Sequence, residues 1–242
     1  MMQKIPRRTF LALTGVAFVS PTFALGEDEP PKVLDHVLLG CSDLDRGIAF
    51  VEEQLGVRAA FGGVHPGRGT RNALLSLGER HYLEIIAPDP RQSHAPDNYG
   101  LKELTGPALV AWAAHPGDVS QLATRLRSAN IPFDGPTPGS RKRPDGRLLQ
   151  WQTLNLKDNH SALLPFFIEW SPNTVHPSVD APAGCKLDRF GIATPDDAEL
   201  QRLSSLLSLD VHIGHAEKPK LHARIAGPNG RVMELNSRET AG

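Results

Sequence analysis

One histidine and two glutamates lie in apolar stretches where ionisable side chains are costly to bury. His36 lies in the apolar stretch 33–39, and Glu84 and Glu169 each lie between two apolar neighbours. A buried carboxylate is destabilising unless a cation or hydrogen bonds compensate its charge. Two carboxylates that converge in one pocket repel each other, so a metal ion or a shared proton must accompany them. The three side chains are therefore candidates for a site with metal or acid–base chemistry.

A glycine-rich stretch between two expected strands concentrates groups that bind anions. It contains His65, Arg68, Arg71 and Asn72. Either arginine could hold a carboxylate or phosphate through two parallel hydrogen bonds, and the glycines allow close backbone approach. These four residues are candidate substrate contacts, and the alternative is an ordinary solvated hairpin loop.

The elements that position these residues recur three times along the chain. Each copy begins with an apolar strand, continues with a helix that an aspartate precedes, and ends with further strands; in the first copy Asp43 can cap the helix. In each copy the aspartate lies seven positions after one residue of the first strand, and the last strand carries a glutamate: His36, Asp43 and Glu84; Ala111, Asp118 and Glu169; Arg189, Asp196 and Glu234.

The expected elements can be given by residue range. The first copy has strands at 33–39, 59–64, 73–77 and 82–86, with a helix from 43 to 56. The second has a strand at 108–114, a helix after 118, a loop at 136–147, and strands at 148–156 and 166–170. The third has strands at 187–193, 211–213, 221–226 and 232–235, with a helix at 198–207. One copy is a half-sheet with an unprotected edge, so two copies must pair to enclose a pocket.

Four short motifs resemble the glyoxalase-like branch of the vicinal oxygen chelate superfamily: Leu34-Asp35-His36, Gly69-Thr70-Arg71-Asn72, Tyr82-Leu83-Glu84 and Pro165-Phe166-Phe167-Ile168-Glu169-Trp170. The resemblance covers about residues 33–172 and extends loosely into the third copy. It implies an α+β fold in which two βαβββ modules at 33–172 pair into a glyoxalase/bleomycin-resistance/dioxygenase-like barrel. A third, module-like copy would follow at 185–237.

The same resemblance implies a divalent metal ion held by the first and last strands of the paired modules. His36, Glu84 and Glu169 would be the metal ligands, and Glu84 and Glu169 would also be catalytic. The identity of the metal stays open among iron, manganese, zinc and nickel. Relatives commonly carry a histidine or glutamine where this chain has Ala111, so a metal-free pocket is an alternative. For His36, a substrate-binding or general-base role and a structural core histidine are further alternatives.

The basic turn 141–147 belongs to the second module. A charge run of this kind is usually a solvated face. The resemblance, in which an arginine before Pro-Asp-Gly recurs, instead assigns Arg143 to substrate binding. Trp112, Trp151 and Tyr82 are expected mainly in the core.

The third copy differs from the first at the histidine position. Arg189 stands there, while Glu234 persists in the last strand. These two could form an internal ion pair, which favours a structural or dimer-capping role and a homodimer as the assembly. The remaining histidines, His212, His215 and His222, fit no compact metal-ligand spacing and are expected at the surface.

Residues 1–24 resemble a bacterial twin-arginine export signal. Arg7 and Arg8 precede an uncharged apolar run of 14 residues, 11–24, whereas a membrane-spanning helix needs ~20. We expect cleavage after Ala24, export by the twin-arginine machinery, a periplasmic or secreted location and no membrane span after cleavage. An ordinary secretory signal or an uncleaved anchor is the alternative. In an exported protein Cys41 and Cys185 could form a disulfide or stay buried thiols.

Charge balance and missing motifs narrow the function. The chain has 26 basic and 27 acidic residues and a net charge of −1, so nothing argues for a nucleic-acid partner. It has no nucleophile elbow, phosphate-binding loop, dinucleotide fingerprint or zinc-protease motif. We expect an exported, metal-dependent lyase, isomerase or dioxygenase acting on a small oxygenated substrate that can be anionic. The alternative is a metal-free protein that sequesters a small molecule, as bleomycin-resistance proteins do.

Overall fold

The computed structural model describes residues 30–238, so the expected export signal lies outside the described residues. The first half contains β1 (Leu34–Gly40), α1 (Leu44–Leu55), β2 (Ala60–His65), β3 (Thr70–Ser76), β4 (Tyr82–Pro88), η1 (Pro90–Gln92) and η2 (Leu101–Glu103). The second half contains β5 (Ala108–Ala114), α2 (Val119–Ser128), β6 (Phe133–Lys142), β7 (Leu148–Leu156), β8 (Phe166–Trp170) and α3 (Pro177–Asp180). The C-terminal part contains β9 (Lys186–Thr194), α4 (Asp197–Leu207), β10 (His212–His215), β11 (Lys220–Ala226), η3 (Pro228–Gly230) and β12 (Val232–Asn236).

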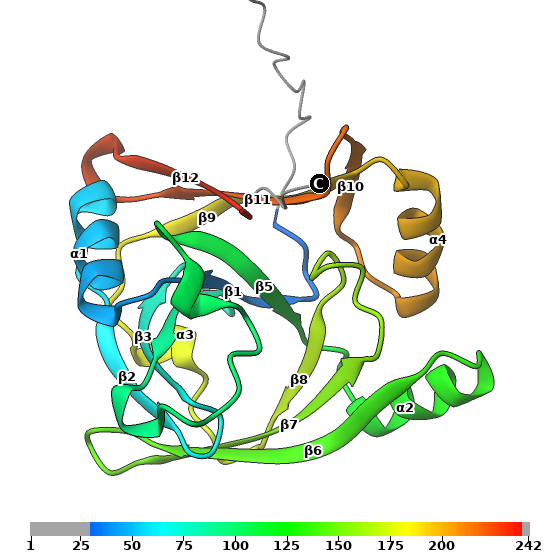
Figure 1. The fold of residues 1–242 in the computed structure, drawn as a ribbon, viewed down its shortest axis with the longest axis horizontal. Coiled ribbons are helices and arrows are strands. Elements are labelled where there is room, and N and C mark those ends of the chain that lie inside the picture. The colour runs from blue at the N-terminus through cyan, green and yellow to red at the C-terminus, as the bar shows by residue number, and fades with distance from the viewer. Residues whose placement is uncertain (1–29, 239–242) are drawn as a thin grey trace, which may run out of the picture.

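The first two copies pair into one curled sheet of eight strands, ordered β2-β3-β4-β1-β5-β8-β7-β6 (Figure 1). In each copy the first strand lies parallel to the last, as β1 does to β4 and β5 to β8. The two copies meet at the antiparallel pair β1–β5, where Val37 lies opposite Trp112. The predicted α+β fold of two paired βαβββ modules is confirmed.

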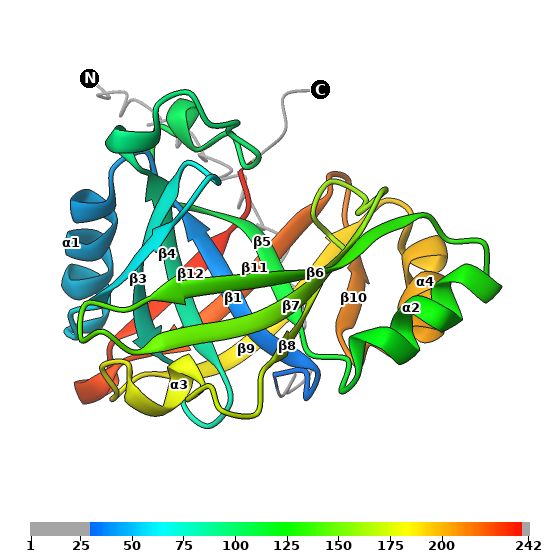
Figure 2. The same ribbon diagram turned by 90° about the horizontal axis from the view of Figure 1, so that it is seen from below.

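The hydrophobic core lies on the outer face of this sheet. On β1, Val37 is fully buried, as are Val51 and Leu55 of α1. Figure 1 shows β9, β11 and β12 passing over the outer side of β1 and β5, and the view in Figure 2 shows the same two layers from below. The rings of Trp112 and Phe190 join the two sheets, with centroids 5.1 Å apart. The C-terminal sheet therefore covers a face that would otherwise be open.

Two aspartates cap the helices of the paired modules. The Asp43 carboxylate accepts a hydrogen bond from the backbone N–H of Arg46 at 2.9 Å, and α1 ends at Gly56 in the left-handed region (φ 76°). The Asp118 carboxylate accepts two backbone N–H bonds in the first turn of α2. Both caps agree with the sequence, because short acidic side chains satisfy the free N–H groups at a helix start.

The prediction of a loop at 136–147 is wrong for the first half of that range. Residues up to Lys142 belong to β6, which pairs antiparallel with β7. This strand contains Pro136 and Pro138, which lack a backbone N–H. Proline is tolerated in an edge strand, and β6 is the last strand of the sheet. The prolines and glycines therefore suggested a loop, although the segment is an edge strand that forms backbone hydrogen bonds with one neighbouring strand.

The C-terminal part has the expected order of elements but a different strand order. Its sheet runs β10-β9-β11-β12, so β11 separates the first strand from the last. The expected Arg189–Glu234 ion pair is wrong for that reason, since those strands are not neighbours. Glu234 instead contacts Arg224 at 2.6 Å and His222 at 2.8 Å. His212 and His215 are exposed, as expected.

Both cysteines are buried free thiols in this structure. Burial, with the Asp43 charge, raises the pKa of Cys41 to about 12, which makes this thiol unreactive at neutral pH. No helix within residues 30–238 is long and apolar enough to cross a bilayer.

Candidate active site

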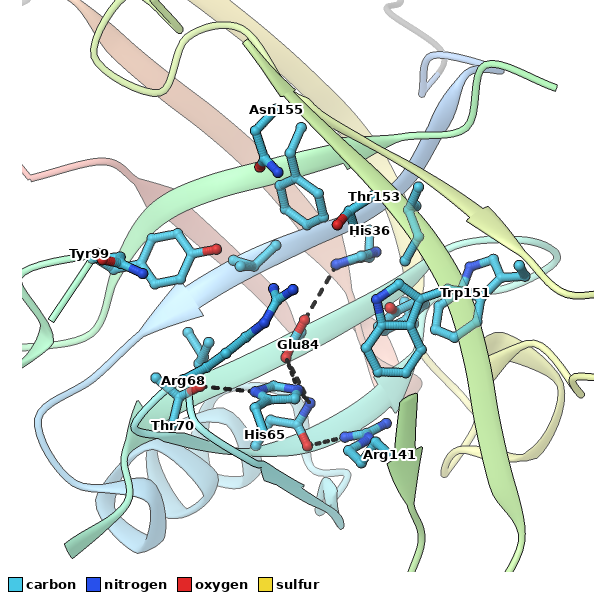
Figure 3. Close-up of a pocket in the computed structure, with 18 residues that line it drawn as sticks. His36, His65, Arg68, Thr70, Glu84, Tyr99, Arg141, Trp151, Thr153 and Asn155 are labelled. Carbon is cyan, nitrogen blue, oxygen red and sulfur yellow. Dashed lines mark hydrogen bonds and ion pairs between the residues drawn. The ribbon is translucent and has the colours of Figure 1, made fainter. Parts of the chain in front are cut away.

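A pocket lies on the inner face of the curled sheet (Figure 3). Alternate residues of a strand face the same side, and the pocket accordingly takes every second residue of three strands: Tyr82, Glu84 and Ile86; Trp151, Thr153 and Asn155; Phe166, Ile168 and Trp170. His36, His65 and Arg141 reach it from β1, β2 and β6. The cavity has about 100 Å³ of space for water-sized molecules, so it suits a small ligand.

His36 lies between two buried carboxylates at the floor of this pocket. Its Nδ1 is 2.6 Å from Oδ1 of Asp35, and its Nε2 is 3.3 Å from Oε2 of Glu84. Exposure is 2% for His36 and Asp35 and 7% for Glu84. An imidazole in contact with two shielded carboxylates is stabilised in its charged form.

The pKa values of this group follow from that arrangement. Burial by itself would lower the pKa of His36, but the hydrogen bonds and charges of Asp35 and Glu84 outweigh burial and raise it to about 9. Burial would raise the pKa of Glu84, yet the hydrogen bond with His36 and the nearby cations lower it to about 2. The pKa of Asp35 is also lowered, because hydrogen bonds from His176 and His36 outweigh its burial. At neutral pH the group is an imidazolium between two carboxylates.

The second carboxylate oxygen of Asp35, Oδ2, is bound by residues of β8 and of the segment that follows it. Oδ2 accepts hydrogen bonds from Nε1 of Trp170 at 3.0 Å and from Nε2 of His176 at 3.2 Å. The His36 ring also stacks on Tyr82 with centroids 4.3 Å apart. These contacts fix the orientation of His36, so Nε2 points towards Glu84 and the pocket.

The other oxygen of Glu84 is held by β2 and β3. Oε1 accepts a hydrogen bond from Nδ2 of Asn72 at 2.6 Å and lies 3.7 Å from Nε2 of His65. Nδ1 of His65 is 2.9 Å from the Thr70 hydroxyl. Burial lowers the pKa of His65 to about 4; Glu84 opposes the shift, and the positive charge of Arg141 adds to it. His65 is therefore neutral at physiological pH.

Arg141 brings a buried positive charge to the wall of the pocket. The residue is 4% exposed, and Nη1 donates a hydrogen bond to Oδ1 of Asn72. Nε has no hydrogen-bond partner within residues 30–238. The side chain passes Gly62 and Gly63 of β2, where a Cβ on Gly62 would lie 2.6 Å from Nη1. The two glycines therefore leave the space through which β6 delivers this guanidinium.

Arg68 supplies a second guanidinium from the hairpin between β2 and β3. Figure 3 shows its side chain reaching into the pocket. The hairpin is fixed by Gln92, which accepts from the N–H of Gly67 at 2.7 Å and donates to the carbonyl of His65 at 3.2 Å. Gly67 has φ 74°, a conformation that favours glycine. Arg68 therefore combines an exposed side chain with a place in the lining of the pocket.

Glu169 does not join His36 and Glu84, and that prediction is wrong. Residues Phe166, Ile168 and Trp170 of β8 face the pocket, so Glu169 faces the opposite side of the sheet. Its Oε2 accepts a hydrogen bond from the backbone N–H of Val119 at 2.9 Å. The carboxylate therefore stabilises the start of α2, where acidic groups are favourable.

Two expected substrate contacts also lie elsewhere. Arg71 alternates with Asn72 on β3 and lines a shallow groove on the outer face. Nη1 of Arg143 lies 2.6 Å from Oδ1 of Asp180, which neutralises it outside the pocket. The structure thus brings together five of the eight predicted site residues: His36, His65, Arg68, Asn72 and Glu84.

Sequence reasoning missed Arg141, although it lies in the basic turn that was singled out. Assigning β6 as a loop removed the alternation that would have separated Arg141 from Lys142. Trp151 was expected in the core but lines the pocket, as does Thr153 two residues along β7. Pairing β6 with β7 in the right register would have placed Arg141, Trp151 and Thr153 on the pocket face.

The donor atoms of this pocket do not fit the divalent metal site that the resemblance implies. Nε2 of His36 and Nε2 of His65 lie against different oxygens of Glu84, and His36 is held as an imidazolium, which has no lone pair free for a metal ion. On β8, the strand expected to carry a ligand, the residues that face the pocket are Phe166, Ile168 and Trp170, and none of them is a usual metal ligand. Within residues 30–238 no three His, Cys, Asp or Glu side chains are placed to hold a metal ion.

Comparisons with known proteins agree with the fold. A hypothetical protein from Staphylococcus aureus has a similar structure with a TM-score of 0.58 and 15% identity, covering 85% of this chain and 86% of that one. Methylmalonyl-CoA epimerase from Mycobacterium tuberculosis has a TM-score of 0.43 and 21% identity, covering 60% and 90%. No curated protein matches the sequence. The model of the glyoxalase-like domain matches residues 34–207, and the chain therefore belongs to the glyoxalase-like domain family.

Proposed function

We propose that this protein binds a small organic anion in the pocket and transfers a proton to or from it, as an isomerase or lyase does. The observation that carries the proposal is the buried Arg141 guanidinium. It forms no ion pair with a carboxylate of residues 30–238, and its Nε lacks a partner. Glu84 acts on this guanidinium through space, but no carboxylate of these residues contacts it directly, and a buried polar N–H without an acceptor is destabilising. A bound anion supplies the direct contact and the acceptor.

The two guanidiniums hold the anionic group in this proposal. Arg141 binds it within the pocket, and the exposed Arg68 closes over it from the hairpin. The ligand then lies over His36 and Glu84, whose facing atoms are 3.3 Å apart. A carboxylate or phosphate matches the planar guanidinium geometry.

Glu84 and His36 move the proton. Glu84 takes a proton from the carbon next to the ligand's carbonyl group, and the C–H electron pair shifts to form an enolate. Nε2–H of His36 keeps its proton and donates a hydrogen bond to the enolate oxygen. The proton then returns to carbon, which restores the carboxylate. The negative charge of the bound anion raises the pKa of Glu84 above its resting value of about 2 and makes it a better base.

Binding and proton transfer can be tested together in D2O. The protein is incubated with pyruvate and with 2-oxobutanoate, and proton NMR follows both ligand binding and loss of the C–H signal next to the carbonyl. We expect exchange above the buffer rate. Arg141→Met should weaken binding at least tenfold, and Glu84→Gln should abolish exchange while binding persists. Arg46→Met, at an exposed site on α1, is the matched control and should leave both unchanged.

Each outcome decides between functions. Binding that depends on Arg141 without any exchange would identify a protein that sequesters a small anion. Equal behaviour of the wild type and Arg141→Met towards both acids would overturn the proposal.

A further inference from the structure

We infer that Thr153 is a specificity-determining residue of this pocket, which hydrogen-bonds a neutral oxygen of the ligand. The inference rests on the proposed anion-binding function and deepens it. It narrows the ligand to a small acid that carries a hydroxyl or carbonyl oxygen besides its anionic group.

The hydroxyl of Thr153 is buried without a partner. The residue is 4% exposed, and Oγ1 has no hydrogen bond within residues 30–238. Thr153 lies on the pocket face of β7 between Trp151 and Asn155, and Figure 3 shows its side chain directed into the pocket. An unpaired buried hydroxyl is destabilising, so something in the pocket must satisfy it.

The fold itself does not need this hydroxyl. Valine has the same shape and a similar preference for strands, and the neighbour on β8 is Ile168. The other threonine of the pocket behaves differently, because the hydroxyl of Thr70 is 2.9 Å from Nδ1 of His65. Ser204 also has an unpaired buried hydroxyl, but it lies on α4, away from any pocket described here. Thr153 is thus the unpaired hydroxyl that faces the ligand space.

A ligand that carries an oxygen gains a hydrogen bond there, whereas its deoxy analogue leaves the hydroxyl unpaired. Sites built to bind a ligand hydroxyl reject the analogue that lacks it. Arg141 and Thr153 lie on neighbouring strands, β6 and β7, and both have an unpaired buried polar atom. We assign the anionic group to Arg141 and a second, neutral oxygen of the ligand to the Thr153 hydroxyl.

The test compares lactate with propanoate, which differ by one hydroxyl, in titrations followed by calorimetry or NMR. We expect the wild type to prefer lactate by about tenfold, the size of one neutral hydrogen bond. Thr153→Val should lose this preference, with unchanged affinity for propanoate, and Thr153→Ser should keep it. Thr105→Val, at an exposed position in the loop before β5, is the matched control and should behave as wild type. Thermal melts confirm that each variant folds.

The results separate this inference from the proposed function. A lactate preference that survives in Thr153→Val, or no preference in the wild type, would overturn the role of Thr153 while leaving anion binding intact. Failure of both acids to bind, with the same result for Arg141→Met, would overturn the anion site and this inference with it.

Discussion

The protonation of His36 depends on the residue that precedes it in the sequence. Asp35 contacts Nδ1 at 2.6 Å and uses its second oxygen to bind Trp170 and His176. The sequence indicated a functional histidine but not its charge. Two of the three groups that set the charge come from distant parts of the chain, Glu84 directly and His176 through Asp35.

Stability should fall as pH rises above neutrality. The pKa of His36 is raised from 6.5 to about 9 in the folded state, so protonation stabilises the fold fully below pH ~6.5 and this contribution is lost between pH ~6.5 and ~9. Thermal melts from pH 6 to 10 should show the loss, of the order of a few kcal/mol. Asp35→Asn should flatten the dependence, whereas Asp45→Asn, at an exposed site on α1, should not. A wild-type midpoint that is constant over this range would contradict the prediction.

Metal removal should leave the protein unchanged. Because no three His, Cys, Asp or Glu side chains of residues 30–238 are placed to hold a metal ion, we expect a chelator not to shift the melting temperature of the wild type. Glu84→Gln should be less stable than the wild type, since the amide cannot balance the His36 charge, and equally indifferent to chelator. Elemental analysis of protein purified without added metal is the complementary measurement. A stoichiometric divalent ion lost on chelation would show that the side chains rearrange around a metal.

At the scale of elements, the register of two strands determines which side chains reach the pocket. The first module was predicted well, because β1, β4 and α1 have strong apolar periodicity and Asp43 marks the helix start. Glu169 was misplaced because β8 is short, at five residues, and its apolar residues occupy both faces. Arg141 was missed because an edge strand tolerates the prolines that usually mark a loop. The local sequence pattern predicts that a segment is a strand, but its hydrogen-bonded register with the neighbouring strand determines which side chains face the pocket.

Gly62 should be intolerant of any side chain. A Cβ there would lie 2.6 Å from Nη1 of Arg141 and 3.0 Å from Cγ of Leu74. Gly62→Ala should therefore displace Arg141, weaken anion binding and cost about 1–3 kcal/mol of stability by overpacking. Gly106→Ala is the control, since a Cβ on Gly106 meets nothing within 4 Å. Calorimetric titration and thermal melts check both effects, and equal ligand affinity in the two variants would contradict the role of the gap.

Glu169 should affect stability and not ligand binding. Glu169→Ala removes the acceptor for the Val119 N–H at the start of α2 and should cost about 1 kcal/mol. Glu169→Gln keeps an acceptor oxygen and should cost less. Ligand affinity measured by NMR should match the wild type in both variants. A tenfold loss of affinity in Glu169→Gln would return this residue to the binding site.

At the scale of the whole molecule, the paired modules and the C-terminal sheet form a shared core. Trp112 packs on Phe190. Nη1 of Arg231 donates a hydrogen bond of 2.6 Å to the backbone carbonyl of Glu53, near the end of α1. The C-terminal sheet was read as a third copy because its elements follow in the same order. The order of strands in a sheet depends on which strands pair, and no local sequence pattern encodes this pairing.

Export by the twin-arginine route remains a prediction about residues outside the described range. Replacing Arg7 and Arg8 together by lysine should leave the precursor in the cytoplasm, because the paired guanidiniums are the recognition signal. Fractionation and immunoblotting of both forms measure the location. Unchanged export of the double variant would assign the protein to the general secretory route.

The C-terminal strand also has a consequence for the timing of folding. Ser237 forms a parallel bridge with Leu109, so the last described strand returns to the central strand β5. This part of the outer face of β1 and β5 stays uncovered until β9 to β12 have been synthesised. The paired modules therefore cannot complete their core before β9 is made, and a nascent chain stalled before β9 would expose Trp112 to chaperones.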